Sequence, residues 1–320
     1  MRIAVLTSGG DAPGMNACIR ATVRAALARG WEILGARYGY NGLVRNEVVP
    51  LGHDAVSNII QRGGTILGAG RCPELLTSEG IDRAVATLRL HEIEGLVAIG
   101  GDGTFRGLRD LCAAWGGQGI GIPGTVDNDA TGTDFTIGFD TAVNTALEAI
   151  DRIRDTAESY ERCFIVEVMG RGSGALAIAA ALAGGAEEVC VPETPTDEEA
   201  IARRIVQGKA AGRLSSIIVT AEGDETGGAA GLAARLEAIS GVQFRVCVLG
   251  HVQRGGSPTA RDRILASRLG AFAVEVLARG EGNVILGEKA NALATTPLSQ
   301  VGAAAPADVR DFQLVSLLSR

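Results

Sequence analysis

A short segment, PGTVDND at residues 123–129, combines a hydroxyl group with carboxylates at alternating positions. In extended backbone Thr125, Asp127 and Asp129 would lie on one face, because successive side chains of a strand point to opposite faces. A carboxylate within hydrogen-bond reach of a hydroxyl group can accept its proton while that oxygen attacks phosphorus, which is the base role in kinases. Taken alone, the segment is better explained as an Asx-rich turn after a strand.

The segment GGDGT at residues 100–104 reverses that preference. Asp102, between two glycines, could approach a Mg²⁺ ion bound to nucleotide phosphates, since magnesium sites use one or two carboxylates together with phosphate oxygens. A tight type I′ or II′ turn is the structural alternative for GGDGT by itself. The two segments together favour a metal–nucleotide site beside a base.

Three more loops contain glycine and polar residues: TSGGDAPGMN at 7–16, MGRGSG at 169–174 and HVQRGGSP at 251–258. Loops that follow parallel strands are where α/β proteins bind ligands, and glycine lets backbone N–H groups approach phosphate. A P-loop is excluded, because neither Lys209 nor Lys289 precedes serine or threonine. The G-x-G-x-x-G match at 119–124 contains Pro123 and does not open a helix, so it does not indicate a dinucleotide site.

Arginines near these segments are candidates for binding phosphate oxygens. Any one of them is more commonly a solvated surface charge, and a lone histidine such as His251 is more often structural than catalytic. Arg171 is expected at the start of a helix, and the other candidates are Arg71 after LGAG, Arg254 before a double glycine, and Arg162 and Arg245 just before strands.

Short apolar runs alternate with helical segments, which predicts an α/β fold with parallel strands. The predicted strands are 3–7, 33–38, 95–99, 119–122, 164–169, 216–221, 245–249 and 284–286. The predicted helices are 15–28, 81–90, 105–114, 141–158, 175–183, 197–211, 231–239 and 259–278, with Thr196 as the N-cap of the sixth.

The length of 320 residues predicts about two domains. No proline-rich or charged linker divides the sequence, so we expect the chain to cross between the domains more than once.

The formal net charge of -7 argues against nucleic acid or an anionic membrane as a partner. The six cysteines include no CxxC pair and read as reduced, mostly buried thiols. No signal peptide or membrane span is recognisable, and cytoplasm is the expected location.

Five segments in this order, SGGDAPGMNA, GGDGT, PGTVDNDATGTDFTIGFDTA, VEVMGR and LGHVQRGGSP, resemble the ATP-dependent 6-phosphofructokinases of bacteria. The resemblance runs from about Met1 to Ala290. It implies phosphoryl transfer from MgATP to the 1-hydroxyl of fructose 6-phosphate, and a homotetramer. It also implies two three-layer domains with mainly parallel sheets: a nucleotide domain of residues 1–138 and 251–300, and a sugar-phosphate domain of residues 139–250 and 301–320.

The resemblance also implies roles for individual residues. Asp127 resembles the base, with Thr125 and Asp129 orienting the sugar and Arg71 and Arg171 neutralising the phosphoryl group in transit. The residues that resemble the ATP and Mg²⁺ site are Gly10, Arg71, Cys72, Gly101, Asp102, Gly103 and Thr104, with Asp102 toward the metal. Those that resemble the sugar-phosphate site are Thr125, Asp127, Asp129, Met169, Gly170, Arg171, Glu222, His251 and Arg254, joined by Arg162 and Arg245 from a neighbouring subunit.

Four alternative functions remain open from the sequence. Pyrophosphate-dependent relatives typically have Asp where this chain has Gly103 and Lys where it has Gly124, so the two glycines favour ATP as the donor. Other sugar phosphates could be acceptors within the same family. GGDGT alone would also fit a lipid or NAD kinase, and a catalytically silent metabolite sensor would keep the fold without the chemistry.

The family's allosteric pocket for ADP or phosphoenolpyruvate is matched by Arg20, Arg24, Arg152, Arg154, Glu187 and Arg213. Two basic positions are lost, because His53 stands where arginine is usual and Ala211 where lysine is usual. Each lost phosphate contact removes about 1.5 to 3 kcal/mol.

We therefore predict altered or weak effector control. An ADP titration of the enzyme should show binding at least about tenfold weaker than a pocket with both basic residues would give. Tight ADP binding with strong activation would contradict this expectation.

Overall fold

The computed structural model describes residues 1–302 and 309–319, which form two compact units. Unit 1 holds Met1–Thr125, Asp129–Thr141 and the stretch from Arg254 through the last strand. Unit 2 holds Val126–Asn128, Ala142–Gln253 and the C-terminal helix. The chain thus passes between the units more than once. Of the segment 301–320 expected in the sugar-phosphate domain, residues 303–308 and 320 lie outside the described residues.

Unit 1 contains a seven-stranded sheet in the order β11-β10-β5-β4-β1-β2-β3. Five neighbouring strands, from β10 to β2, pair in parallel, while β3 and β11 add to the two edges in antiparallel fashion. The strands are β1 (Arg2–Thr7), β2 (Glu32–Ala36), β3 (Val48–Pro50), β4 (Gly95–Gly100), β5 (Gln118–Pro123), β10 (Val284–Lys289) and β11 (Ala292–Pro297).

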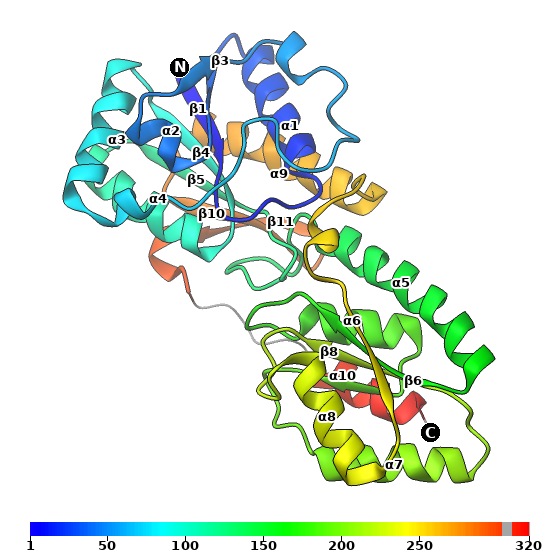
Figure 1. The fold of residues 1–320 in the computed structure, drawn as a ribbon. Coiled ribbons are helices and arrows are strands. Elements are labelled where there is room, and N and C mark those ends of the chain that lie inside the picture. The colour runs from blue at the N-terminus through cyan, green and yellow to red at the C-terminus, as the bar shows by residue number, and fades with distance from the viewer. Residues whose placement is uncertain (303–308, 320) are drawn as a thin grey trace. The chain divides into compact units, whose positions relative to one another are not determined.

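Helices cover both faces of this sheet (Figure 1). One face carries α1 (Met15–Ala28) and α9 (Ala260–Ala278), which pack against each other. The other carries α2 (Tyr40–Val44), α3 (Ser78–Leu90) and α4 (Asp102–Trp115). Short 3₁₀ helices, at Asp54–Val56 (η1), Pro73–Leu76 (η2) and Leu298–Gln300 (η4), lie in the connections.

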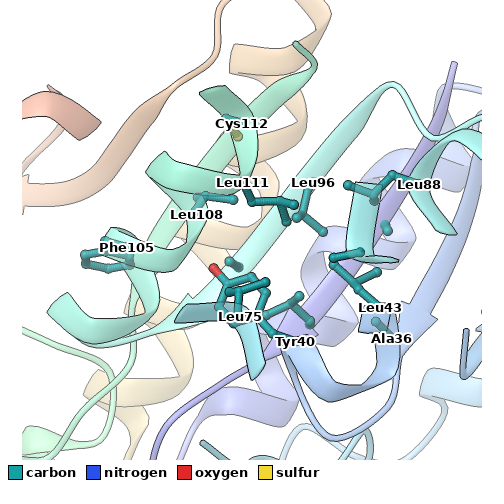
Figure 2. Packing of buried hydrophobic residues seen from close by; sticks show 14 of the residues in the cluster. Ala36, Tyr40, Leu43, Leu75, Leu88, Leu96, Phe105, Leu108, Leu111 and Cys112 are labelled. Atoms are coloured by element: carbon teal, nitrogen blue, oxygen red, sulfur yellow. The ribbon is translucent and has the colours of Figure 1, made fainter. Parts of the chain in front are cut away.

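The core between the sheet and α2 to α4 is built from aliphatic and aromatic side chains (Figure 2). Phe105, Leu108 and Leu111 of α4 share this cluster with Leu88 of α3 and Leu96 of β4. The glycines of β5 make room for α4, because a Cβ at Gly121 would meet the Phe105 ring at 2.7 Å. The G-x-G spacing of β5 therefore serves helix packing.

Unit 2 contains a four-stranded parallel sheet in the order β7-β8-β6-β9. Helices α7 and α8 pack together over one core, while α6 contacts β7 and β8 and packs against α10 (Figure 1). The strands are β6 (Cys163–Val168), β7 (Glu188–Cys190), β8 (Ser216–Ala221) and β9 (Phe244–Val248). The helices are α5 (Phe139–Tyr160), α6 (Ala175–Gly184), α7 (Glu198–Ala210), α8 (Gly228–Ser240), α10 (Val309–Leu318) and the 3₁₀ helix η3 (Gly250–Arg254).

The α/β class with mainly parallel sheets is confirmed, and each predicted strand and helix has a counterpart. The prediction of Thr196 as the N-cap of α7 was wrong. The Thr196 hydroxyl donates to Asp224, and Asp197 caps the helix by accepting from the Ala200 amide at 2.9 Å.

Four of the six cysteines are buried. Burial raises the pKa of Cys112 to about 12, as expected for an unreactive thiol. Among the residues described, no helix is both long and apolar enough to cross a membrane.

Leu88 provides a test of this core. Its side chain is fully buried, so Leu88→Ala should lower the free energy of unfolding by about 2–5 kcal/mol through lost burial and an unfilled cavity. The matched control is Leu90→Ala on the same helix, where the side chain is 68% exposed and the change should be within about 0.5 kcal/mol. Urea unfolding of both variants measures the difference, and equal losses would contradict the packing described.

Candidate active site

Three loops of unit 1 meet at one edge of its sheet, because β1, β4 and β5 are parallel neighbours and end together. The amide of Ser8 donates to the carbonyl of Ile99 at 3.0 Å, and the amide of Gly124 donates to that of Gly100 at 3.0 Å. The hydroxyl of Thr104 reaches back to the Ser8 carbonyl at 3.2 Å. The segments TSGGD and GGDGT and the start of PGTVDND are therefore held against one another.

Asp102 begins α4 at this edge and is partly exposed. Its carboxylate accepts hydrogen bonds from the amide of Thr131 at 3.0 Å and from the Thr131 hydroxyl at 3.2 Å. The next residue, Gly103, is exposed, and a Cβ placed there would meet nothing within 4 Å. An anchored carboxylate thus stands beside open space at a helix N-terminus, where anions are favoured.

Thr104 has a structural position. Its side chain is buried and bonded to Ser8, and its carbonyl accepts from the Tyr40 hydroxyl at 2.6 Å. Burial raises the pKa of Tyr40 well above its ordinary value, so the phenol keeps its proton and the hydrogen bond. Thr104 therefore joins the first two loops.

The loop that carries Arg71 and Cys72 is fastened to the same edge. The carbonyl of Gly70 accepts from the amide of Gly9 at 3.2 Å and from the Ser8 hydroxyl at 3.3 Å. Asn41 donates to the Arg71 carbonyl at 3.1 Å, and the Arg71 side chain is exposed. These contacts hold the backbone of Gly70 and Arg71 beside the glycine loop.

Asn16 is a positioning residue that the sequence reasoning missed. Its amide group donates to the carbonyls of Arg62 and Gly63 at 3.1 Å, and its oxygen accepts from the amide of Ile66 at 2.8 Å. Asn16 is buried just after the first glycine loop. It holds the start of the segment that leads to Arg71.

Arg254 lies on the first loop. Its Nη1 donates to the Asp11 carbonyl at 3.3 Å, and a Cβ at Gly10 would overlap the same guanidinium group. Glycine at position 10 thus leaves room for the guanidinium group, which a side chain there would displace. Arg254 was expected among the sugar-phosphate residues, and the structure brings it to the loop of Gly10.

The segment of Asp127 departs from the extended geometry expected of it. The strand ends at Pro123, the chain bends at Val126 and Asp127, and Asn128 adopts a left-handed φ of 51°. The argument from one strand face was therefore wrong in its geometry, because the chain turns as it leaves unit 1. Thr125 and Asp127 are nevertheless both buried, at 9% and 7% exposure.

The second unit repeats the design of parallel strands with polar loops at their carboxyl ends. Met169 follows β6, Glu222 follows β8 and His251 follows β9, and these strands are neighbours. The amide of Arg171 donates to the Glu222 carboxylate at 3.0 Å, and Gly223 leaves room for the Arg171 carbonyl. The four residues Met169, Gly170, Arg171 and Glu222 therefore lie together.

Arg171 is not at the start of a helix as expected, because α6 begins only at Ala175. A tight turn intervenes, in which Arg171 has a φ of 54° and the amide of Ser173 donates to the Gly170 carbonyl at 2.8 Å. The N-terminal side of α6 is occupied by Glu193, which accepts from the amide of Gly174 at 2.8 Å. The exposed Arg171 side chain is thus presented by the turn.

Gln253 was also missed by the sequence reasoning. It is fully buried, its oxygen accepts from the Met169 amide at 2.8 Å, and its nitrogen donates to the Ala142 carbonyl at 3.4 Å. It connects the loop after β9 to the loop after β6. The sequence signal that could have identified Gln253 is its position between His251 and Arg254 in HVQRGGSP.

Arg162 and Arg245 are not brought together with Met169 and Glu222. Arg162 immediately precedes β6, and Arg245 is the second residue of β9, which pairs beside it. Both therefore lie near the amino end of their strands, about 20 Å along β6 from Met169 at roughly 3.3 Å per residue. Both side chains are exposed.

Two of the expected effector residues share a cavity of about 230 Å³ in unit 2. Glu187 and Arg213 line it together with Ala211, and Arg213 donates to the Ser319 carbonyl at 2.8 Å. Arg154 donates to the carbonyls of Gly184 and Gly185 at 2.6 and 2.8 Å. Arg20 and Arg24 lie on α1 in unit 1, and His53 is exposed before η1.

Comparison with known proteins identifies the family. The model of the family described as "Phosphofructokinase" matches residues 2–277. The ATP-dependent 6-phosphofructokinase 1 of Thermus thermophilus is 59% identical over 299 residues, covering 93% of each chain. The ATP-dependent 6-phosphofructokinase of Bacillus licheniformis is 51% identical over 292 residues, covering 91% of each chain.

Solved structures agree on the fold. The phosphofructokinase of Saccharomyces cerevisiae superposes with a TM-score of 0.88 at 32% identity, covering 98% of this chain and 45% of that one. The pyrophosphate-dependent enzyme of Marinobacter aquaeolei has a TM-score of 0.84 at 23% identity, covering 98% of this chain and 91% of that one, and shares the fold. The architecture and the extent of identity together show that this chain belongs to the phosphofructokinase family.

Proposed function

We propose that this chain is an ATP-dependent 6-phosphofructokinase, which transfers the γ-phosphoryl group of ATP to the 1-hydroxyl of fructose 6-phosphate. The products are fructose 1,6-bisphosphate and ADP. The observation that carries this proposal is identity of 51–59% over about nine-tenths of the chain to enzymes of that name. A lipid or NAD kinase is not favoured, because GGDGT is here one of several motifs that match a single family.

The edge of unit 1 is the proposed site for ATP and Mg²⁺. Its residues would be Gly10, Arg71, Cys72, Gly101, Asp102, Gly103 and Thr104. The described residues contain no group of three His, Cys, Asp or Glu side chains that could hold a metal by themselves. A single anchored carboxylate at Asp102 fits magnesium that is held mainly by nucleotide phosphates. When bound, the ion would neutralise phosphate charge during transfer.

The two glycines proposed to favour ATP have different surroundings. At Gly103 the surrounding space is open, so a side chain there would project where the nucleotide is proposed to bind. At Gly124 a Cβ would meet Ile99 at 3.0 Å and Met15 at 3.3 Å, so a longer side chain would press on the protein interior. Gly103 thus leaves this edge of the sheet open, whereas Gly124 avoids crowding in the interior of unit 1.

The proposed sugar-phosphate residues in the loops of unit 2 are Met169, Gly170, Arg171, Glu222 and His251. Arg254, which belongs to unit 1, is proposed to bind the same substrate. Asp127 is the proposed base that takes the proton of the 1-hydroxyl as its oxygen attacks the γ-phosphorus. Thr125 and Asp129 would orient the sugar and the transferring group. Arg71 and Arg171 would neutralise the charge on the phosphoryl oxygens in transit.

Arg162 and Arg245 are proposed to bind the 6-phosphate of a site in a neighbouring subunit of a homotetramer. Their position near the amino end of β6 and β9 supports this, because their own chain's loops at the carboxyl end are out of reach. Strand β9 is also an edge strand, and its Val248 is 58% exposed. We also propose that the protein is located in the cytoplasm.

An effector site is proposed at the cavity of Glu187 and Arg213 in unit 2. The other residues that the resemblance assigns to effector binding are Arg154 of unit 2 and Arg20 and Arg24 of unit 1. Arg213 already bonds the Ser319 carbonyl. An anionic ligand would compete for that donor, which agrees with the weak effector control expected from Ala211 and His53.

The base assignment predicts a specific loss of rate. Asp127→Ser should lower kcat by several orders of magnitude while fructose 6-phosphate binding is largely retained, because a base acts in the transition state. The control is Asp110→Ser on the exposed face of α4, which should keep wild-type kcat. Steady-state kinetics and equilibrium binding measure the two effects. Unchanged turnover in Asp127→Ser would remove Asp127 from this role.

The shared site predicts rescue between two inactive variants. Asp127→Ser and Arg245→Ala, co-expressed in equal amounts, should form mixed oligomers with about a quarter of wild-type turnover. Half of the sites have an intact base, and half of those face an intact Arg245 of a neighbour.

The matched control combines Asp127→Ser with Arg171→Ala, whose changes both affect the site of their own chain. That mixture should stay inactive. If the Arg245→Ala mixture also stays inactive, Arg245 does not act across subunits.

A further inference from the structure

A buried carboxylate outside the proposed catalytic residues joins α9 to the first turn of α5, which up to Thr141 also belongs to unit 1. Asp262 lies in the first turn of α9 and is 1% exposed. One oxygen accepts from the amide of Gly138 at 2.9 Å, and the other accepts from the amide of Thr141 at 2.8 Å and from its hydroxyl at 2.5 Å. Asp262 thus caps the N-terminus of α5, where a negative charge is favoured by the helix dipole.

The N-terminus of α9 is capped in the same place. Thr259 is its N-cap, and the Thr259 amide donates to the Thr141 hydroxyl at 3.0 Å. The Thr259 hydroxyl donates to Asp140 at 2.6 Å. Each helix therefore supplies polar groups to the first turn of the other, and the two N-termini are fixed as one body.

This body continues directly into the loop that follows β5. Just before Gly138, the amide of Ile137 donates to the Pro123 carbonyl at 2.9 Å. The hydroxyl of Thr136 donates to the Thr125 carbonyl at 2.6 Å, and both threonines are buried. Residues 136–138 are therefore hydrogen-bonded to Asp262 at one end and to Thr125 at the other. Thr125 directly precedes the segment that contains Asp127.

The first glycine loop rests on the same cluster. A Cβ at Gly14 would meet Ile137 at 2.6 Å and the Cβ of Asp262 at 3.6 Å. A Cβ at Gly138 would meet that of Ala12 at 2.7 Å. Two of the loops that form the candidate site therefore depend on where Asp262 holds residues 136–141.

We propose that Asp262 is a positioning residue for phosphoryl transfer: it holds the N-terminus of α5, and through it the Thr125 loop and the first glycine loop. The inference rests on the function proposed above. The carboxylate accepts from three donors without offering one. Burial raises the pKa of its carboxyl group, whereas the bonds from Thr141 and Gly138 lower it. An amide in its place would turn an N–H group toward these donors and leave at least one without an acceptor.

The test is Asp262→Asn, assayed with saturating ATP, Mg²⁺ and fructose 6-phosphate well below its melting temperature. We expect kcat to fall about 10- to 100-fold, because a displacement near 1 Å is enough for such a loss. KM for both substrates should change by less than about threefold, since the loss concerns the arrangement of reacting groups.

The control separates positioning from stability. Leu88 lies in the core between the sheet and α2 to α4, away from Asp262 on the α9 side. Leu88→Ala should lower the melting temperature at least as much as Asp262→Asn, yet keep wild-type kcat. If kcat falls equally in both variants, or if Asp262→Asn keeps wild-type kcat, the positioning role is overturned.

A second pair of variants tests the positioning role even if Asp262→Asn does not fold. Thr141→Val removes the hydroxyl that bonds Asp262 and Thr259, and should reproduce part of the loss in kcat. Thr141→Ser keeps the hydroxyl and should restore wild-type kcat. Equal rates in the two would overturn the proposal. A wild-type protein without turnover would instead contradict the proposed function itself.

Discussion

Parallel pairing of β4 with both β1 and β5 is the constraint on which the candidate site depends. Parallel strands end at the same edge, so loops that are far apart in the sequence are forced to meet there. Backbone hydrogen bonds from Ser8 and Gly124 then fix the distance between these loops. The pairing of β6 with β8 and β9 does the same for Met169, Glu222 and His251 in unit 2.

Glycines and buried polar side chains then fix the conformations of these loops. Gly10 and Gly223 allow a guanidinium group and a carbonyl to approach the backbone closely, while Gly103 leaves space open. Asn16, Gln253 and Asp262 satisfy buried amides and carbonyls that loops would otherwise leave without partners. The groups proposed to react are thus positioned by residues that have no proposed part in the chemistry.

Much of this could be predicted from the sequence, because strand and helix signals are local. The elements β3, β7, β11, α2 and α10 were not predicted. The three strands lie at sheet edges, where pairing depends on tertiary contacts more than on periodicity. The Asx-rich turn weighed for PGTVDND does occur, at Asn128, whereas the left-handed turn at Arg171 was missed because arginine, unlike glycine, does not signal such a position. Positioning residues such as Asp262 become visible only when their partners, more than a hundred residues away in sequence, are located.

The most direct test is turnover of fructose 6-phosphate by the wild-type protein in the presence of Mg²⁺, with either ATP or pyrophosphate as the donor. Formation of fructose 1,6-bisphosphate and ADP in equal amounts with ATP, and no product with pyrophosphate, is the result expected of this site. Product with pyrophosphate alone, or no product with either donor, would contradict it.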